Sequence, residues 1–179
     1  GNTETSSRIV DVVFAALGEL VPVPAAGQGT MNNLAFGNDR FTYYETVGGG
    51  QGACPDAGGP SGVHVAMSNT LATPTEAIEL EYPLRVERWE LRLGSGGNGS
   101  HRGGDGVVRE LRVLEDCRLS VLAERRRHAP PGCAGGEDGA RGRTLVNGAE
   151  QPSKLTRQLY AGDVVRVETP GGGGHGCAD

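Results

Sequence analysis

Clustered glycine is the feature that most constrains how this chain can fold. Of its 179 residues, 31 are glycine, more than twice the usual share of about 7%. The glycines follow no strict three-residue repeat, which excludes a collagen helix. They lie in short bursts between well-patterned apolar segments, which excludes a flexible linker. Because aromatic residues make up only 4% of the chain, we expect a core of Val, Leu and Ala with many backbone turns.

Length, charge and cysteine spacing exclude several classes of protein. The length suits a single domain over residues 1–179. The net charge is -5 with both signs interspersed, so no nucleic-acid partner is expected. No apolar run approaches the roughly 20 residues of a membrane span, and no secretion signal is visible, so we expect no membrane partner and a cytoplasmic location. The four cysteines form no C-x-x-C pair, which predicts reduced thiols and no metal ligands.

Residues 5–20 carry the one clear helical period. Their apolar side chains recur at steps of three and four and predict an amphipathic helix whose apolar stripe packs on a sheet. The members of this stripe are Ile9, Val12, Val13, Ala16, Leu17 and Leu20.

The rest of the chain alternates mostly with a period of two, which is typical of half-buried strands. A change of parity near Glu87-Arg88 predicts a bulge, and Asn147-Gly148 predicts a two-residue hairpin. We therefore predict an α+β, mainly β fold: a glycine-rich antiparallel β-domain, sandwich- or barrel-like, with an N-terminal helix. Strands are expected at 41–47, 63–70, 78–82, 84–86, 89–93, 107–113, 117–123 and 145–146, with a closing hairpin formed by 154–159 and 164–168.

Two segments in the first half of the chain combine polar side chains with turns. The adjacent amides of Asn32 and Asn33 could orient a ligand or satisfy turn backbone. Gly48, Gly49 and Gly50 end an expected strand, so their N–H groups could meet an anion or an oxyanion, or the glycines could simply make a crowded bend.

Further segments allow both a functional and a structural interpretation. His64, on an expected strand, could be a base or a hydrogen-bonded structural residue. Arg102 and Asp105 favour an ion-paired turn. The basic run 124–128 favours a solvated or partner-facing edge, and the glycines of 169–176 favour a tail, although they could pack into a site.

Taken in order, these segments resemble a known family. Nine blocks match the C-terminal part of the hydantoinase B/oxoprolinase family, and together they cover nearly the whole chain. The blocks are residues 1–12 (GNTETSSRIVDV), 28–33 (QGTMNN), 43–50 (YYETVGGG), 61–64 (SGVH), 67–70 (MSNT), 81–86 (EYPLRV), 102–106 (RGGDG), 124–126 (ERR) and 169–174 (TPGGGG).

The resemblance implies a part of an ATP-dependent cyclic amidase of the hydantoinase or 5-oxoprolinase kind, or of a related carboxylase. In such enzymes an A-type subunit or domain uses ATP to activate the carbonyl of a small cyclic amide, and the B-type subunit handles the activated ring. The family's metal-binding residues lie in the N-terminal part of the B subunit, so ATP and a divalent metal are expected in the full enzyme and no cofactor on this chain. Two departures stand out, because Ala66 replaces a frequent second histidine and His175 a frequent tyrosine.

We therefore predict the following roles. Glu45 and His64 are the candidate catalytic groups, since a carboxylate and an imidazole can carry protons. The candidate substrate-binding residues are Asn32, Asn33, Asn69, Gly48, Gly49 and Gly50. Two rival interpretations remain: a structural or subunit-interaction β-domain without catalytic groups, and an independent domain that binds a small ligand. We expect no turnover by the chain alone.

Overall fold

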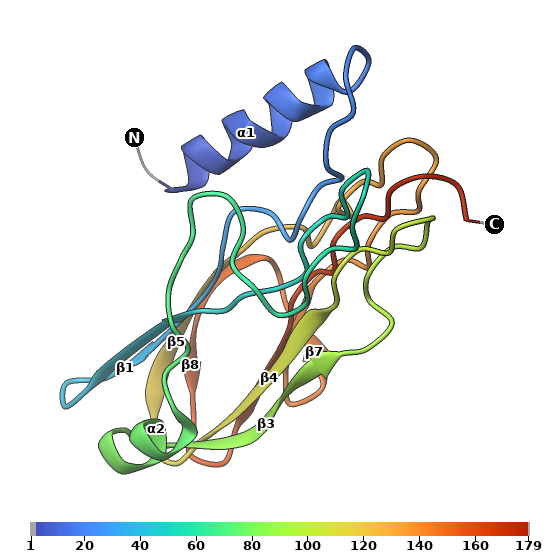
Figure 1. Cartoon of the computed structure of the whole chain (residues 1–179). Coiled ribbons are helices and arrows are strands. Elements are labelled where there is room, and N and C mark those ends of the chain that lie inside the picture. The colour runs from blue at the N-terminus through green and yellow to red at the C-terminus, as the bar shows by residue number, and fades with distance from the viewer. Residues whose placement is uncertain (1–2, 179) are drawn as a thin grey trace.

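Two antiparallel sheets form the body of the protein, seen in a computed structural model that describes residues 3–178 (Figure 1). Gly1 and Asn2, which open the first matched block, lie outside the described residues. One sheet has the order β2-β1-β5-β8 and the other β3-β4-β9-β6-β7. The sheets do not close into a barrel, so the predicted α+β, mainly antiparallel fold is confirmed in its sandwich-like form. The elements are α1 (Thr3–Leu17), β1 (Asn32–Gly37), β2 (Thr42–Thr46), α2 (Thr75–Glu81), β3 (Leu84–Arg92), β4 (Gly106–Val113), β5 (Cys117–Ala123), β6 (Arg143–Val146), β7 (Ala149–Glu150), β8 (Lys154–Leu159) and β9 (Val164–Glu168).

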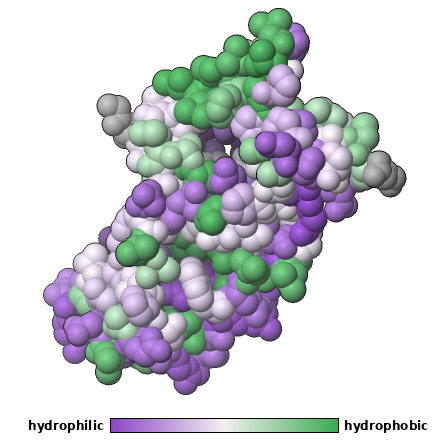
Figure 2. Space-filling model, in the orientation of Figure 1, coloured by the Kyte–Doolittle hydropathy of each residue, from purple (hydrophilic) through white to green (hydrophobic). Residues whose placement is uncertain are grey.

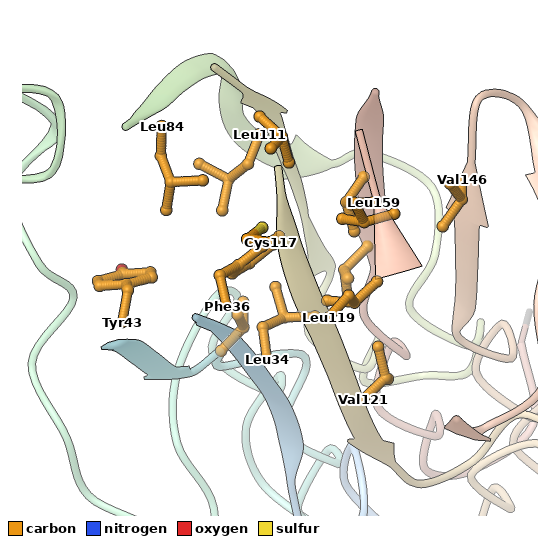
Figure 3. Packing of buried hydrophobic residues seen from close by; sticks show 14 of the residues in the cluster. Leu34, Phe36, Tyr43, Leu84, Leu111, Cys117, Leu119, Val121, Val146 and Leu159 are labelled. Carbon is orange, nitrogen blue, oxygen red and sulfur yellow. The ribbon is translucent and has the colours of Figure 1, made fainter. Parts of the chain in front are cut away.

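The hydrophobic core lies where the two sheets face each other (Figure 3). Leu34 and Phe36 of β1 pack there with Leu119 of β5 and Leu111 of β4. Each of these side chains is at most 1% exposed. Successive strand residues point to opposite faces, so the alternation in the sequence predicts which side chains are buried.

Helix α1 has the opposite orientation to the one expected. Its apolar stripe faces solvent, with Val12 67% and Leu20, just beyond the helix, 80% exposed. Polar side chains hold it to the body instead: Arg8 pairs with Glu124, and Asp11 accepts a hydrogen bond from Arg125 at 2.8 Å. The prediction of the helix is thus confirmed, whereas its packing on a sheet is wrong (Figure 1).

Two predicted strands are also wrong. Residues 75–81 form helix α2, because they follow Pro74 and are rich in good helix formers. The helix buries Ile78 and leaves Leu80 83% exposed. Residues 64–70 form a loop, since Gly62 and Ala66 adopt positive φ angles that interrupt an extended strand.

The predictions for β3 and β6 are confirmed. The register of β3 on β4 shifts between Val86 and Arg88, where the bulge was expected. Asn147 and Gly148 have φ angles of 50° and 79° in the β6–β7 hairpin, as a type I′ turn requires.

The two strands expected to close the chain as a hairpin exist, but they do not pair with each other. β8 pairs with β5 in one sheet, whereas β9 pairs with β4 and β6 in the other. The turn between them carries the chain from sheet to sheet.

The glycine-rich segments run side by side as extended chains at the end of the sandwich near α1 (Figure 1). The amide of Gly50 donates to Pro170 and that of Ala53 to Gly173, each at 2.9 Å. From one hydrogen bond to the next, each of the two segments advances by three residues, which is the period of a polyproline II helix. The segment at 169–176 is accordingly not a tail, and nearly all of it is buried.

Glycine is required in these segments because neighbouring backbones touch. A Cβ on Gly172 would lie 1.9 Å from the carbonyl oxygen of Gln51, and a Cβ on Gly104 would lie 1.9 Å from that of Pro60. No real Cβ approaches a backbone oxygen so closely, so the composition of the chain follows from this packing.

Candidate functional site

Asn32 and Asn33 stand at the start of β1 and point to opposite faces of the sheet, as neighbours on a strand must. Asn32 is on the inner face and is 1% exposed. Its Nδ2 donates to Oε1 of Gln28, and its Oδ1 accepts from Nη1 of Arg126, both at 2.6 Å.

Asn33 lies on the outer face with Tyr44. Both line a shallow cleft of about 480 Å³, and Nδ2 of Asn33 lies 3.3 Å from the sulfur of Met31. The two amides expected to work together are therefore separated by the sheet, and their roles in substrate binding stay predictions.

The amides of Gly49 and Gly50 already donate hydrogen bonds within the domain. They donate to the carbonyl oxygens of Val63 and Pro170, each at 2.9 Å. Gly49 also lies against the side chain of Gln28, and a Cβ there would be 2.5 Å from Oε1. Gly48 packs on the carbonyl of Val63. This geometry favours a structural role over the predicted contact with an oxyanion.

Glu45 points into the sandwich, on the same face as the core side chains. Its carboxylate pairs with the guanidinium of Arg109 at 3.1 Å, and both side chains are at most 3% exposed. The same guanidinium lies 4.3 Å from the centre of the Trp89 ring. Burial, followed by the charge of Glu45, raises the pKa of Tyr43. A carboxylate enclosed in this way is placed to hold the sheets together, and its predicted part in proton transfer stays untested.

His64 is the candidate catalytic group that retains access to solvent. Its Nδ1 lies 3.2 Å from Oγ of Ser68, and its Nε2 lies 3.0 Å from Oγ1 of Thr70. Partial burial lowers the pKa of the imidazole, which favours the neutral form that can accept a proton. Asn69 lies on the same loop, between the two hydroxyl residues, and is exposed.

Arg126 is the residue that sequence reasoning missed. The run 124–128 was expected to form a solvated or partner-facing edge, yet burial, followed by the nearby charge of Arg92, lowers the pKa of Arg126 to about 10. A Cβ on Gly142 would lie 2.3 Å from its Nη1, so a glycine about 16 residues away makes room for it. No local sequence signal connects these two positions.

The ion-paired turn at 102–106 is confirmed. Arg102 and Asp105 lie 2.7 Å apart, and the Asp105 carboxylate also accepts from the amide of Gly96 at 2.8 Å. Burial alone would raise the pKa of Asp105, but Arg102 and the backbone amides outweigh it and lower that pKa.

The described residues offer no metal centre. Within residues 3–178, no group of three or more His, Cys, Asp and Glu side chains could hold a metal ion. All four cysteines are free, and burial raises the pKa of the Cys117 thiol to about 11. In the same part of the chain, no helix is long and apolar enough to cross a membrane.

The sandwich and its motifs define a B-type β-domain of the hydantoinase kind. Residues 1–178 match the family described as hydantoinase B/oxoprolinase, and the chain belongs to this family. It is 45% identical over 181 residues to 5-oxoprolinase 1 of Arabidopsis thaliana and 43% identical over 184 residues to 5-oxoprolinase of Dictyostelium discoideum.

A solved structure shows the same architecture. The ATP-dependent caprolactamase from Pseudomonas jessenii superposes with a TM-score of 0.77 at 25% identity, over 91% of this chain and 32% of that chain. The two 5-oxoprolinases align with 98% and 100% of this chain, yet the chain spans only 14% of either protein.

Proposed function

We propose that the chain forms the C-terminal domain of the B-type subunit of an ATP-dependent cyclic amidase. In this proposal it helps bind and open the ring of a carbonyl-activated cyclic amide, and it does not turn over substrate alone. Membership of the family and the similarity to two 5-oxoprolinases and a caprolactamase support the class of substrate.

The proposed supporting role rests on one observation: most candidate polar groups are ion-paired or hydrogen-bonded to other residues of the domain. Glu45 is paired with Arg109, Asn32 is held between two side chains, and the amides of Gly49 and Gly50 donate to carbonyl oxygens. Groups that are paired in this way can keep the domain rigid, but they are not free to bind a substrate.

His64 is the group to which we assign chemistry. A neutral imidazole on a partly open loop can take a proton from attacking water or deliver one to the nitrogen that leaves the opened ring. The hydroxyl groups of Ser68 and Thr70 orient the imidazole through its two nitrogens.

The remaining parts of such an enzyme would lie outside this chain. We expect an A-type subunit or domain that uses ATP, and a divalent metal held by the N-terminal part of the B subunit. The exposed apolar face of α1 would pack against that larger assembly, since isolated domains rarely leave so many apolar side chains of one helix in water.

The first experiment measures ATP-dependent ring opening of 5-oxoproline and of N-methylhydantoin. The chain of residues 1–179 and a complete B-type subunit are each mixed with the A-type partner. We expect turnover only with the complete subunit. Turnover with the shorter chain would overturn the supporting role and locate the chemistry here.

The second experiment tests His64 in the complete subunit. Because general acid–base catalysis contributes about 100-fold or more, we expect His64→Gln to lower kcat by at least about that factor without changing the melting temperature. His128→Gln, at an exposed position, is the matched control. Unchanged turnover in His64→Gln would exclude His64 as a catalytic group.

A further inference from the structure

Four arginines surround a pocket of about 440 Å³ on the side of the sandwich formed by β3, β6 and the segment after β5. They come from segments far apart in the sequence and meet only in the folded protein. The lining residues are Arg92, Arg126, Arg141, Gly142, Arg143 and Glu150.

Positive charge exceeds negative charge around this pocket. The buried carboxylate of Glu168 is shared among Arg92, Arg143 and Arg166, with nitrogen–oxygen distances of 3.3, 2.6 and 2.9 Å. One carboxylate thus serves three guanidinium groups, and Glu150 is the one acidic side chain of the lining. This excess contrasts with the net charge of -5 of the whole chain.

The inner arginines are held in place before any ligand arrives. Arg126 donates to Asn32 and to the carbonyl oxygen of Glu124 at 2.6 and 2.7 Å. Arg92 donates to the carbonyl oxygens of Arg141 and Thr169 at 2.7 and 3.2 Å. Side chains already ordered in this way lose little entropy when they bind.

Donor groups remain for a ligand. Among the described residues, Nη2 of Arg126 has a contact of 3.5 Å with Oγ1 of Thr144, and the guanidinium of Arg141 has one of 3.5 Å with the carbonyl oxygen of Arg127. Both contacts are at the limit of a hydrogen bond. Burial and the neighbouring positive charges lower the pKa values of Arg92 and Arg126, and a bound anion would relieve that repulsion.

We infer that this arginine pocket binds a small oxyanion, namely the phosphate or carboxylate group of a ligand. Guanidinium groups match both through paired N–H···O bonds. The inference stands on the pocket alone and is independent of the function proposed above.

Calorimetric titration of the chain with inorganic phosphate, and separately with malonate, tests this inference. Both titrations are done at one ionic strength set with sodium chloride, so that general screening is equal. We expect saturable binding of at least one anion, and the stronger of the two identifies the chemistry. No saturable heat with either anion would overturn the inference.

Substitutions then locate the binding. Arg141→Gln removes an exposed lining guanidinium and should weaken binding by about tenfold or more, because a charge-assisted bond is lost. Arg118→Gln removes the same charge from an exposed position on β5, outside the lining, and should leave the affinity unchanged. Equal affinities for Arg141→Gln and the unsubstituted chain, with equal melting temperatures, would overturn the assignment to this pocket.

Discussion

At the scale of single residues, the protein uses polar side chains to connect segments that lie far apart in the sequence. Asn32 links Gln28 on one side to Arg126 on the other, and Glu45 links β2 to Arg109 of the facing sheet. Buried polar groups must be paired, so these contacts explain residue choices that otherwise look like binding motifs.

Replacement of Glu45 separates its structural and catalytic interpretations. Glu45→Ala leaves the guanidinium of Arg109 buried and without its carboxylate, so we expect the free energy of unfolding to fall by about 3–5 kcal/mol. Urea denaturation measures the change. Glu90→Ala, at an exposed position on the edge strand β3, should change it by less than about 0.5 kcal/mol. Lost turnover of a complete subunit with unchanged stability would instead make Glu45 catalytic.

At the scale of elements, the extended glycine segments form a hydrogen-bonded layer of their own, separate from the two sheets. Three successive amides of one segment reach three different neighbours: Gly171 donates to Ala140, Gly172 to Gly104 and Gly173 to Ala26. A β-strand bonds to neighbours on two sides only, so this arrangement needs backbones that approach without side chains between them.

Replacement of glycine by alanine should therefore lower stability far more where another backbone touches the glycine than where the space beside it is open. Gly172→Ala would force a Cβ within 1.9 Å of the carbonyl oxygen of Gln51, whereas at Gly58 the nearest atom is 3.3 Å away. Because the backbone must move, we expect Gly172→Ala to cost at least about 3 kcal/mol of stability. Gly58→Ala should cost less than about 1 kcal/mol. Thermal unfolding compares the two, and similar melting temperatures would contradict the close-packed arrangement.

At the scale of the whole molecule, an apolar surface covers α1 on the side that faces away from the sheets (Figure 2). A cleft of about 660 Å³ separates part of the helix from the body. Exposed apolar side chains of α1 outside the lining of this cleft are Ile9, Val13 and Leu17, whereas Val12 and Phe14 line it. Since the relatives are several times longer than this chain, we assign this surface to contact with the rest of the proposed B-type subunit.

The substitution Ile9→Lys, at a position that is 58% exposed and outside the cleft lining, tests that assignment. In the chain of residues 1–179 the side chain is in water, so the free energy of unfolding should change by less than about 0.5 kcal/mol. In the complete subunit a buried lysine without a partner should cost about 2 kcal/mol or more. Chemical denaturation of both proteins checks this, and equal effects would show that α1 stays exposed in the larger protein.

Local patterns predicted much of the sheet structure. The alternation in β4 and β5, the bulge near Glu87, the Asn147-Gly148 hairpin and the Arg102–Asp105 pair each depend on neighbours within a few residues. These interactions are nearly the same in any tertiary context, so the sequence by itself determined them.

The tertiary structure decided which surfaces meet. Periodicity shows that α1 has an apolar face but not what covers it, and an extended segment has no preferred partner until another backbone arrives. For this reason β8 and β9 belong to different sheets, the glycine segments have three neighbours, and Arg126 is half-buried beside Gly142. The candidate residues could be listed from the sequence, but burial and hydrogen-bond partners are set by contacts between distant segments, and these contacts decided which groups stay open to a ligand.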